Sequence, residues 1–203
     1  MKIKYIFKSP ILQELSFFVE NKIRYISQEE VTGTVGLTPI QKWFLDNENN
    51  KHHFNQSILL RSEEVISKKV LDKVLRKLIS HHDALRMSYY EKEDKWIQTI
   101  NTVKNNYEII EIEINDFTLY EDQINDYSQN LQASFDLDKG PLFKACIFKS
   151  KKENRLLLVA HHLVIDGVSW RIILEDIGTL FSQINKGEKI KLPLKTDSYK
   201  YWR

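Results

Sequence analysis

Apolar residues recur at two spacings along the chain, and these spacings predict its helices and strands. Spacings of roughly three and four residues are typical of a helix with one buried face, and alternation or a short apolar run is typical of a strand. The cap-and-proline pair Thr38-Pro39 also predicts a helix start. Helices are predicted over residues 38–46, 66–79, 121–133 and 168–185. Strands are predicted over residues 53–61, 84–90, 95–100, 107–114, 142–149 and 155–161.

These elements predict the domain organisation. Residues 1–25 contain an amphipathic helix that begins at Ser9-Pro10, and the polar, turn-prone residues 26–36 are interpreted as a linker. Residues 37–203 then form an α/β domain of the α+β type, in which helices pack on a mixed, largely antiparallel sheet. Near its end, Gly187 is expected to close the long helix, and Thr196 to Ser198 are expected to start another.

Composition places the chain among ordinary globular proteins. Of its 203 residues, 42% are hydrophobic and 29% are charged, and the net charge of +2 gives no reason to expect nucleic acid or a membrane as partner. The single cysteine, Cys146, lies in an apolar run and is interpreted as a core residue rather than a nucleophile. A chain with one cysteine forms no internal disulfide, which fits a cytoplasmic location.

Two adjacent histidines end the last predicted strand. The apolar run 156–160 leads into His161-His162, and Asp166-Gly167 follows as a turn before the long helix. Because successive strand residues point to opposite faces, His161 and His162 should occupy different environments, one packed inward and one beside open space. Imidazole, with an ordinary pKa of roughly 6.5, suits proton transfer at working pH.

Other chemistry at this segment is less well supported by the pattern. A buried histidine followed by a simple turn remains an open alternative. His162 and Asp166 span a strand and a turn, so helical ligand spacing does not apply, and no metal site is predicted. Ser169 lacks the second glycine of a nucleophile elbow. A histidine base without a protein nucleophile fits best, with Asp166 fixing the turn by hydrogen bonds or an arginine pair.

The segment resembles a known family signature. Residues 161–167, HHLVIDG, resemble the HHxxxDG motif of the condensation-domain superfamily of nonribosomal peptide synthetases, which has the chloramphenicol-acetyltransferase-like fold. The blocks HDALR at 82–86 and DLDKGPL at 136–142 resemble further family segments in the same order. TPIQKWF at 38–44, HFNQS at 53–57 and the residues after Gly167 are similar to the epimerization subtype.

The resemblance implies a reaction and roles for particular residues. An epimerization domain converts L to D at the Cα of an aminoacyl or peptidyl thioester. It binds no cofactor directly, since the substrate is carried on the 4'-phosphopantetheine of a carrier protein. His162 would be the catalytic acid/base. His161, Asp166, Gly167 and Arg86 would be structural, with Arg86 as the ion-pair partner of Asp166 and Gly167 allowing close approach of the substrate.

The resemblance also implies that 37–203 is the N-terminal lobe of such a domain. In the family, an opposing glutamate stands on a second lobe, which is expected to be absent here, so the chain alone is expected to be inactive. Residues 5–16 resemble the tail of a carrier domain, so 1–25 would be a carrier remnant. The expected partners are the carrier protein, other synthetase domains and the second lobe. Two alternatives stay open, a condensation domain that forms a peptide bond and a non-catalytic module that docks carriers.

Overall fold

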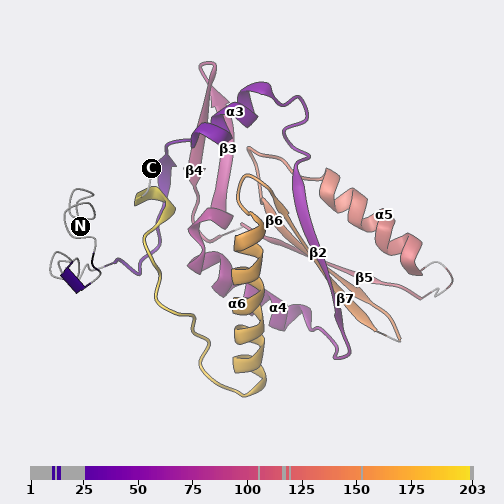
Figure 1. The fold of residues 1–203 in the computed structure, drawn as a ribbon. Coiled ribbons are helices and arrows are strands. Elements are labelled where there is room, and N and C mark those ends of the chain that lie inside the picture. The colour runs from indigo at the N-terminus through magenta and orange to yellow at the C-terminus, as the bar shows by residue number, and fades with distance from the viewer. Residues whose placement is uncertain are drawn as a thin grey trace.

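The structure is a computed structural model that describes residues 11, 13–14, 26–104, 106–115, 118, 120–151 and 153–201 (Figure 1). The predicted carrier-type helix within residues 1–25 lies almost wholly outside the described residues. In chain order the elements are β1 (Gly33–Val35), α3 (Pro39–Asn47), β2 (Asn55–Ser62), α4 (Lys68–His81), the 3-10 turn η1 (Asp83–Arg86), β3 (Met87–Lys92), β4 (Lys95–Ile100), β5 (Glu108–Glu113), α5 (Tyr120–Ala133), β6 (Phe143–Lys149), β7 (Asn154–His161), α6 (Gly167–Asn185) and the 3-10 turn η3 (Tyr199–Tyr201).

The strands form a four-stranded sheet and a smaller three-stranded sheet. In the larger sheet the order is β2-β7-β6-β5, with β5 parallel to β6 and the other neighbours antiparallel. This arrangement confirms the predicted mixed, largely antiparallel sheet with packed helices. The smaller sheet, β1-β4-β3, is antiparallel throughout and was not predicted as a separate sheet. Alternation marks strands but does not show which strands share a sheet.

Two local predictions need correction. Part of the segment interpreted as a linker is strand β1, whose three residues pair with β4. The strand predicted over residues 84–90 begins only at Met87, because Asp83–Arg86 form a 3-10 turn that directs Arg86 into the core. The helices predicted over residues 38–46, 66–79, 121–133 and 168–185 are present, and Gly187 closes α6 with a positive φ of 69°. The helix expected to start at residues 196–198 is instead the 3-10 turn η3.

Helices cover both faces of the four-stranded sheet. Next to α5, Arg155 of β7 binds Glu121, and the ring of Phe148 in β6 meets Tyr127. On the opposite face Phe143 of β6 meets Trp170 of α6, and α4 packs beside α6, as Figure 1 shows. Because both faces are covered, every residue of β7 except Arg155 is buried.

The core confirms the interpretation of Cys146. Its side chain is 2% exposed in β6, and burial raises the pKa of its thiol to about 12, so it is a packing residue and not a nucleophile. None of the described helices is both long enough and apolar enough to cross a membrane.

Candidate active site

His162 lies in the wall of a pocket at the end of β7. The pocket has a volume of about 520 Å³. It lies between the start of α3, the loop that follows β7 and the first turn of α6, and Phe54 and Tyr199 also contribute to its wall. It therefore forms where the sequence predicted open space beside the strand.

The proton position on His162 follows from its hydrogen-bond partners. Nδ1 lies 2.8 Å from the carbonyl oxygen of Ile165, which can only accept, so Nδ1 carries the hydrogen and donates it. Nε2 lies 3.0 Å from the side-chain amide nitrogen of Gln56, which can only donate, so Nε2 holds a lone pair. The ring of Phe54 stacks on the imidazole at 4.8 Å. His162 is thus held as a neutral ring with a basic Nε2.

His161 has the opposite proton arrangement on the opposite face of the sheet. Its Nε2 donates to the carbonyl of Lys51 at 2.7 Å, and its Nδ1 accepts from the backbone N–H of Leu163 at 3.2 Å. The side chain is fully buried and is surrounded by aromatic rings of Phe44, Phe54 and Phe135. Burial lowers its pKa to about 4, so the ring is neutral. The alternation argument for the two histidines is confirmed.

Asp166 caps helix α6. Its Oδ1 accepts from the backbone N–H of Ser169 at 2.7 Å and from the Ser169 hydroxyl at 2.6 Å. These hydrogen bonds lower the pKa of Asp166 and keep it ionised. At Gly167, a Cβ atom would meet nothing within 4 Å, so close approach of a substrate there stays a prediction.

The expected ion pair between Arg86 and Asp166 is not formed, and this prediction was wrong. Arg86 is fully buried and pairs with Asp83 at 2.8 Å. Its remaining N–H groups donate to backbone carbonyls, which belong to Val31, Ile79 and Asn101. The reason is η1, which turns Arg86 back toward the end of α4, while the Asp166 carboxylate is committed to its cap. Arg86 therefore supports the fold beneath the site rather than the turn beside His162.

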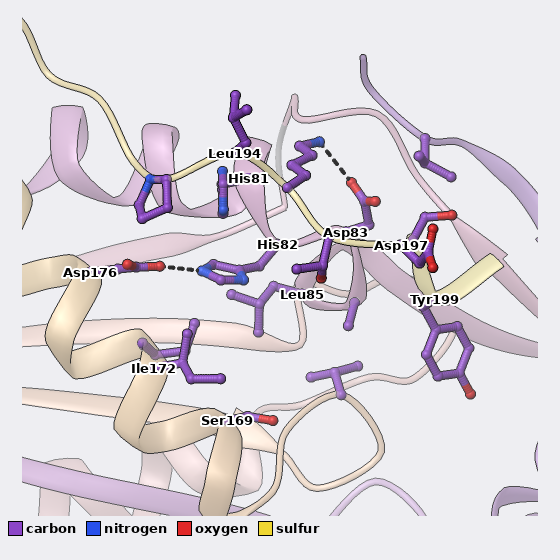
Figure 2. Close-up of a pocket in the computed structure, with 18 of the residues that line it drawn as sticks. His81, His82, Asp83, Leu85, Ser169, Ile172, Asp176, Leu194, Asp197 and Tyr199 are labelled. Carbon is purple, nitrogen blue, oxygen red and sulfur yellow. Dashed lines mark hydrogen bonds and ion pairs between the residues drawn. The ribbon is translucent and has the colours of Figure 1, made fainter. Parts of the chain in front are cut away.

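A second pocket, of about 380 Å³, adjoins the first. The two share the wall residues Ala84, Val164, Ser169 and Tyr199, and Figure 2 shows the second pocket between the end of α4, α6 and the segment at 193–199. Lys195 also lines it and lies 3.3 Å from Asp83.

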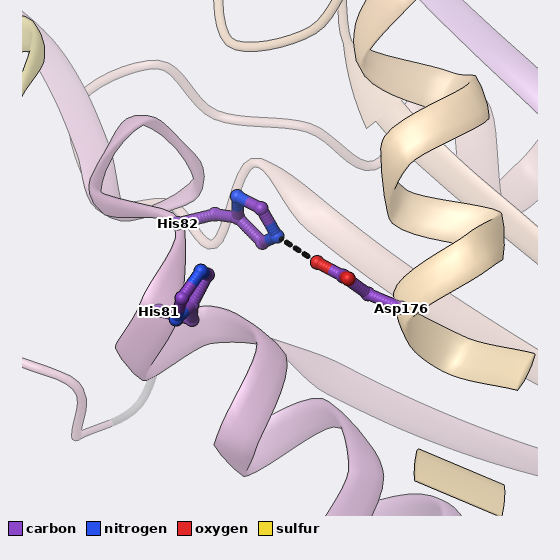
Figure 3. Close-up of side chains that lie close together, drawn as sticks. All are labelled: His81, His82 and Asp176. Carbon is purple, nitrogen blue, oxygen red and sulfur yellow. Dashed lines mark hydrogen bonds and ion pairs between the residues drawn. The ribbon is translucent and has the colours of Figure 1, made fainter. Parts of the chain in front are cut away.

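This second pocket holds a cluster that the sequence placed in separate elements. His81, His82 and Asp176 each bring one ligand atom within 4.8 Å of the others (Figure 3). His82 Nε2 and Asp176 Oδ2 share a hydrogen bond of 2.6 Å, and burial together with the neighbouring His82 lowers the pKa of His81. The His82–Asp176 hydrogen bond connects the end of α4 to α6.

Sequence reasoning missed Gln56 and Trp170 as neighbours of His162. HFNQS served only to indicate the subtype, and Trp170 was part of a helical pattern. Gln56 stands opposite Ala160 in the β2–β7 register, and the backbone N–H of His162 donates to the carbonyl of Phe54 at 2.7 Å. The pairing of β2 with β7 is the information that would have identified Gln56, and this pairing cannot be read from a single sequence.

The fold, with His162 in the wall of a pocket at the end of β7, is that of a condensation-type lobe. A family model described as the condensation domain matches residues 31–203, and the chain therefore belongs to the condensation-domain family. The chain is 40% identical to surfactin synthase subunit 2 of Bacillus subtilis strain 168 over 100% of its length, and 37% identical to tyrocidine synthase 2 of Brevibacillus parabrevis, again over 100%. It spans only 6% of the length of each of those two relatives.

Two solved structures are similar to this chain. The epimerization domain from the third module of tyrocidine synthetase B is 36% identical, with a TM-score of 0.84 over 88% of this chain and 40% of that chain. The starter condensation domain of rhizomide synthetase is 18% identical, with a TM-score of 0.65 over 80% of this chain and 41% of that one. The latter likeness supports the fold alone. The chain is thus similar to a condensation- or epimerization-type domain of a nonribosomal peptide synthetase.

Proposed function

We propose that this chain supplies the histidine base of an epimerization domain. In this proposal Nε2 of His162 removes the Cα proton of an aminoacyl or peptidyl thioester held on the phosphopantetheine arm of a carrier protein. The observation that carries the proposal is the proton arrangement of His162: Nδ1–H is bound to Ile165, so the lone pair on Nε2 is the position that accepts a proton.

Epimerization is favoured over condensation by the degree of similarity. The tyrocidine synthetase epimerization domain is 36% identical to this chain over 88% of the chain. The blocks at 38–44 and 53–57 support the same subtype. A condensation domain remains the second candidate, because the matching family model carries that description.

Completion of the reaction requires groups from outside the described residues. Inversion needs a proton delivered to the opposite face of Cα, and among the described residues that line the pocket the only carboxyl group is Asp166, which caps α6. Large apolar side chains at the pocket are also exposed, with Ile40 at 69%, Trp43 at 61% and Phe54 at 44%. Such a surface suits coverage by a second lobe. We propose that this lobe supplies the opposing acid.

The test joins the chain to the part of the tyrocidine synthetase epimerization domain that the structural match leaves uncovered. A carrier loaded with an L-aminoacyl thioester is incubated in D₂O, and Cα deuterium and configuration are measured after release. We expect exchange with inversion and no new amide. His162→Ala should slow exchange by about 10²–10⁴-fold, because a positioned proton-transfer group contributes that much. Gln129→Ala, an exposed change on α5, is the matched control.

The other outcomes distinguish the alternatives. Amide formation with retained configuration would overturn epimerization in favour of condensation. Carrier binding without exchange or amide formation, unchanged in His162→Ala, would favour a non-catalytic docking module. Without the second lobe, the chain is expected to give little or no inversion.

A further inference from the structure

We propose that Gln56 and Trp170 are positioning residues that hold His162 in the one neutral tautomer able to act as a base at Nε2. The assignment rests on the proposed function for its catalytic meaning, but its structural content can be measured without substrate. Neither residue lines the pocket. A change at either one therefore reaches a substrate chiefly through His162.

The first step is the orientation of the Gln56 amide. Trp170 Nε1–H lies 3.0 Å from Oε1 of Gln56, and an indole nitrogen is a donor only. The amide oxygen must therefore face Trp170. A flipped amide would set its NH₂ group against the indole N–H, so that two donors meet without an acceptor. The indole N–H thus orients the amide so that its NH₂ group faces His162.

The second step is the effect of this amide orientation on the tautomer of His162. With its oxygen on Trp170, Gln56 presents its NH₂ group to Nε2 of His162 at 3.0 Å. Only an unprotonated Nε2 accepts that hydrogen bond. The alternative tautomer would put N–H against N–H at this contact and would also leave the Ile165 carbonyl without the hydrogen of Nδ1. The contacts at both ring nitrogens therefore favour the Nδ1–H tautomer.

The fold fixes the three side chains independently. Gln56 is held by the pairing of β2 with β7, and His162 by its backbone hydrogen bond to Phe54. Trp170 is 7% exposed in the first turn of α6, where its ring meets Phe143 and where Asp166 sets the helix start. The three side chains come from a strand, a loop and a helix. The Trp170–Gln56–His162 relay of hydrogen bonds therefore depends on the tertiary structure and not on a local motif.

The relay also has a consequence after proton transfer. When Nε2 takes the Cα proton, it loses the hydrogen bond from Gln56, and Trp170 keeps the amide from turning to accept the new N–H. The hydrogen bond from Gln56 therefore has to break before Nε2 accepts the Cα proton and forms again when the proton is passed on, so the same contact opposes the first step and favours the second.

The primary test is ¹⁵N-NMR of the histidine rings in the intact chain at neutral pH, with the His162 signals assigned by their loss in His162→Ala. We expect the wild type to show the Nδ1–H tautomer. Trp170→Phe keeps a buried ring but removes the donor, so the amide can turn and the Nε2–H tautomer should gain population. Gln56→Glu offers only acceptor oxygens and should move His162 to a ring protonated at Nε2. Gln129→Leu should change nothing.

A second readout separates positioning from a general loss of structure. In the joined protein, Gln56→Glu should lower kcat at neutral pH with little change in KM, and its pH–rate profile should move toward higher pH. Gln56→Leu removes the amide but leaves the Ile165 contact, so His162 should keep the Nδ1–H tautomer and lose less activity than Gln56→Glu.

The proposal is overturned if folded Trp170→Phe and Gln56→Glu both keep the wild-type ¹⁵N signature of His162. Gln56→Glu decides alone if Trp170→Phe does not fold. If the tautomer shifts as expected but the wild-type joined protein shows no Cα exchange, the positioning relay is supported and the proposed function fails.

Discussion

The two faces of the sheet at the end of β7 give neighbouring histidines opposite roles. On the α5 face, both ring nitrogens of His161 bind backbone groups, and the ring is buried. On the α6 face, His162 binds backbone through Nδ1 alone, and Nε2 meets the side-chain amide of Gln56. The difference shows that the same residue type becomes structural where the backbone uses both nitrogens, and available for chemistry where one nitrogen is left to side chains.

The largest expected effect is on stability and falls on His161. His161→Ala removes a buried ring and leaves the Lys51 carbonyl and the Leu163 N–H without their partner. We expect a loss of about 3–5 kcal/mol in the free energy of unfolding, from the cavity and the unpaired polar groups together. His162→Ala, at the pocket wall, should cost less than about 1 kcal/mol. Urea denaturation of His161→Ala and His162→Ala measures the two losses of stability. Equal losses would contradict the assignment of a structural role to His161 and not to His162.

The next effect is the pH dependence that His161 contributes. Its pKa is about 4 in the folded protein against 6.5 in the unfolded chain, so the unfolded state binds a proton first as the pH falls. The stabilisation from keeping this ring neutral is complete above pH 6.5 and is lost progressively between about 6.5 and 4. Between pH 7 and 5 we expect a loss of roughly 2 kcal/mol from this group, at about 1.4 kcal/mol per pH unit.

The matched control for this effect is His161→Gln, which keeps polar atoms at the position but does not titrate. Other groups titrate equally in both proteins, so the stability difference between wild type and variant should narrow as the pH falls from 7 to 5. A constant difference across this range would contradict the assignment of a neutral, buried His161.

The smallest expected effect concerns the turn that separates His162 from α6. Asp166→Ala removes the acceptor for both Ser169 donors and should cost about 1 kcal/mol of stability, while Asp166→Asn retains an acceptor and should cost less. Thermal or urea unfolding measures both. A loss as large as that of His161→Ala would mean that Asp166 does more than cap the helix.

Much of the fold could be predicted because its signals are local. Helix spacing, the Thr38-Pro39 cap and the strand runs gave elements that agree with the structure within a few residues. The Thr38 cap is a full capping box with Gln41, as a local motif should be. Alternation alone placed His161 and His162 on different faces.

The contacts that crossed elements could not be predicted in the same way. Arg86 has Asp83 as its partner because a 3-10 turn stands where a strand was expected. Asp176 reaches His82 only because α6 packs against α4. Strand pairing and helix packing bring together residues that are far apart in the chain. Neither the pairing nor the packing can be read from a single sequence.

By itself the sequence determined most of the elements, the family resemblance and the two histidines at the end of a buried strand, because periodicity and motifs are local features of the chain. Only the tertiary structure decided which nitrogen of each histidine carries the hydrogen. That choice depends on acceptors and donors from other segments: the carbonyl of Lys51 for His161, and the amide of Gln56 for His162. The hydrogen-bond partners of each ring fix its tautomer, and the tertiary structure determines which partners lie within reach.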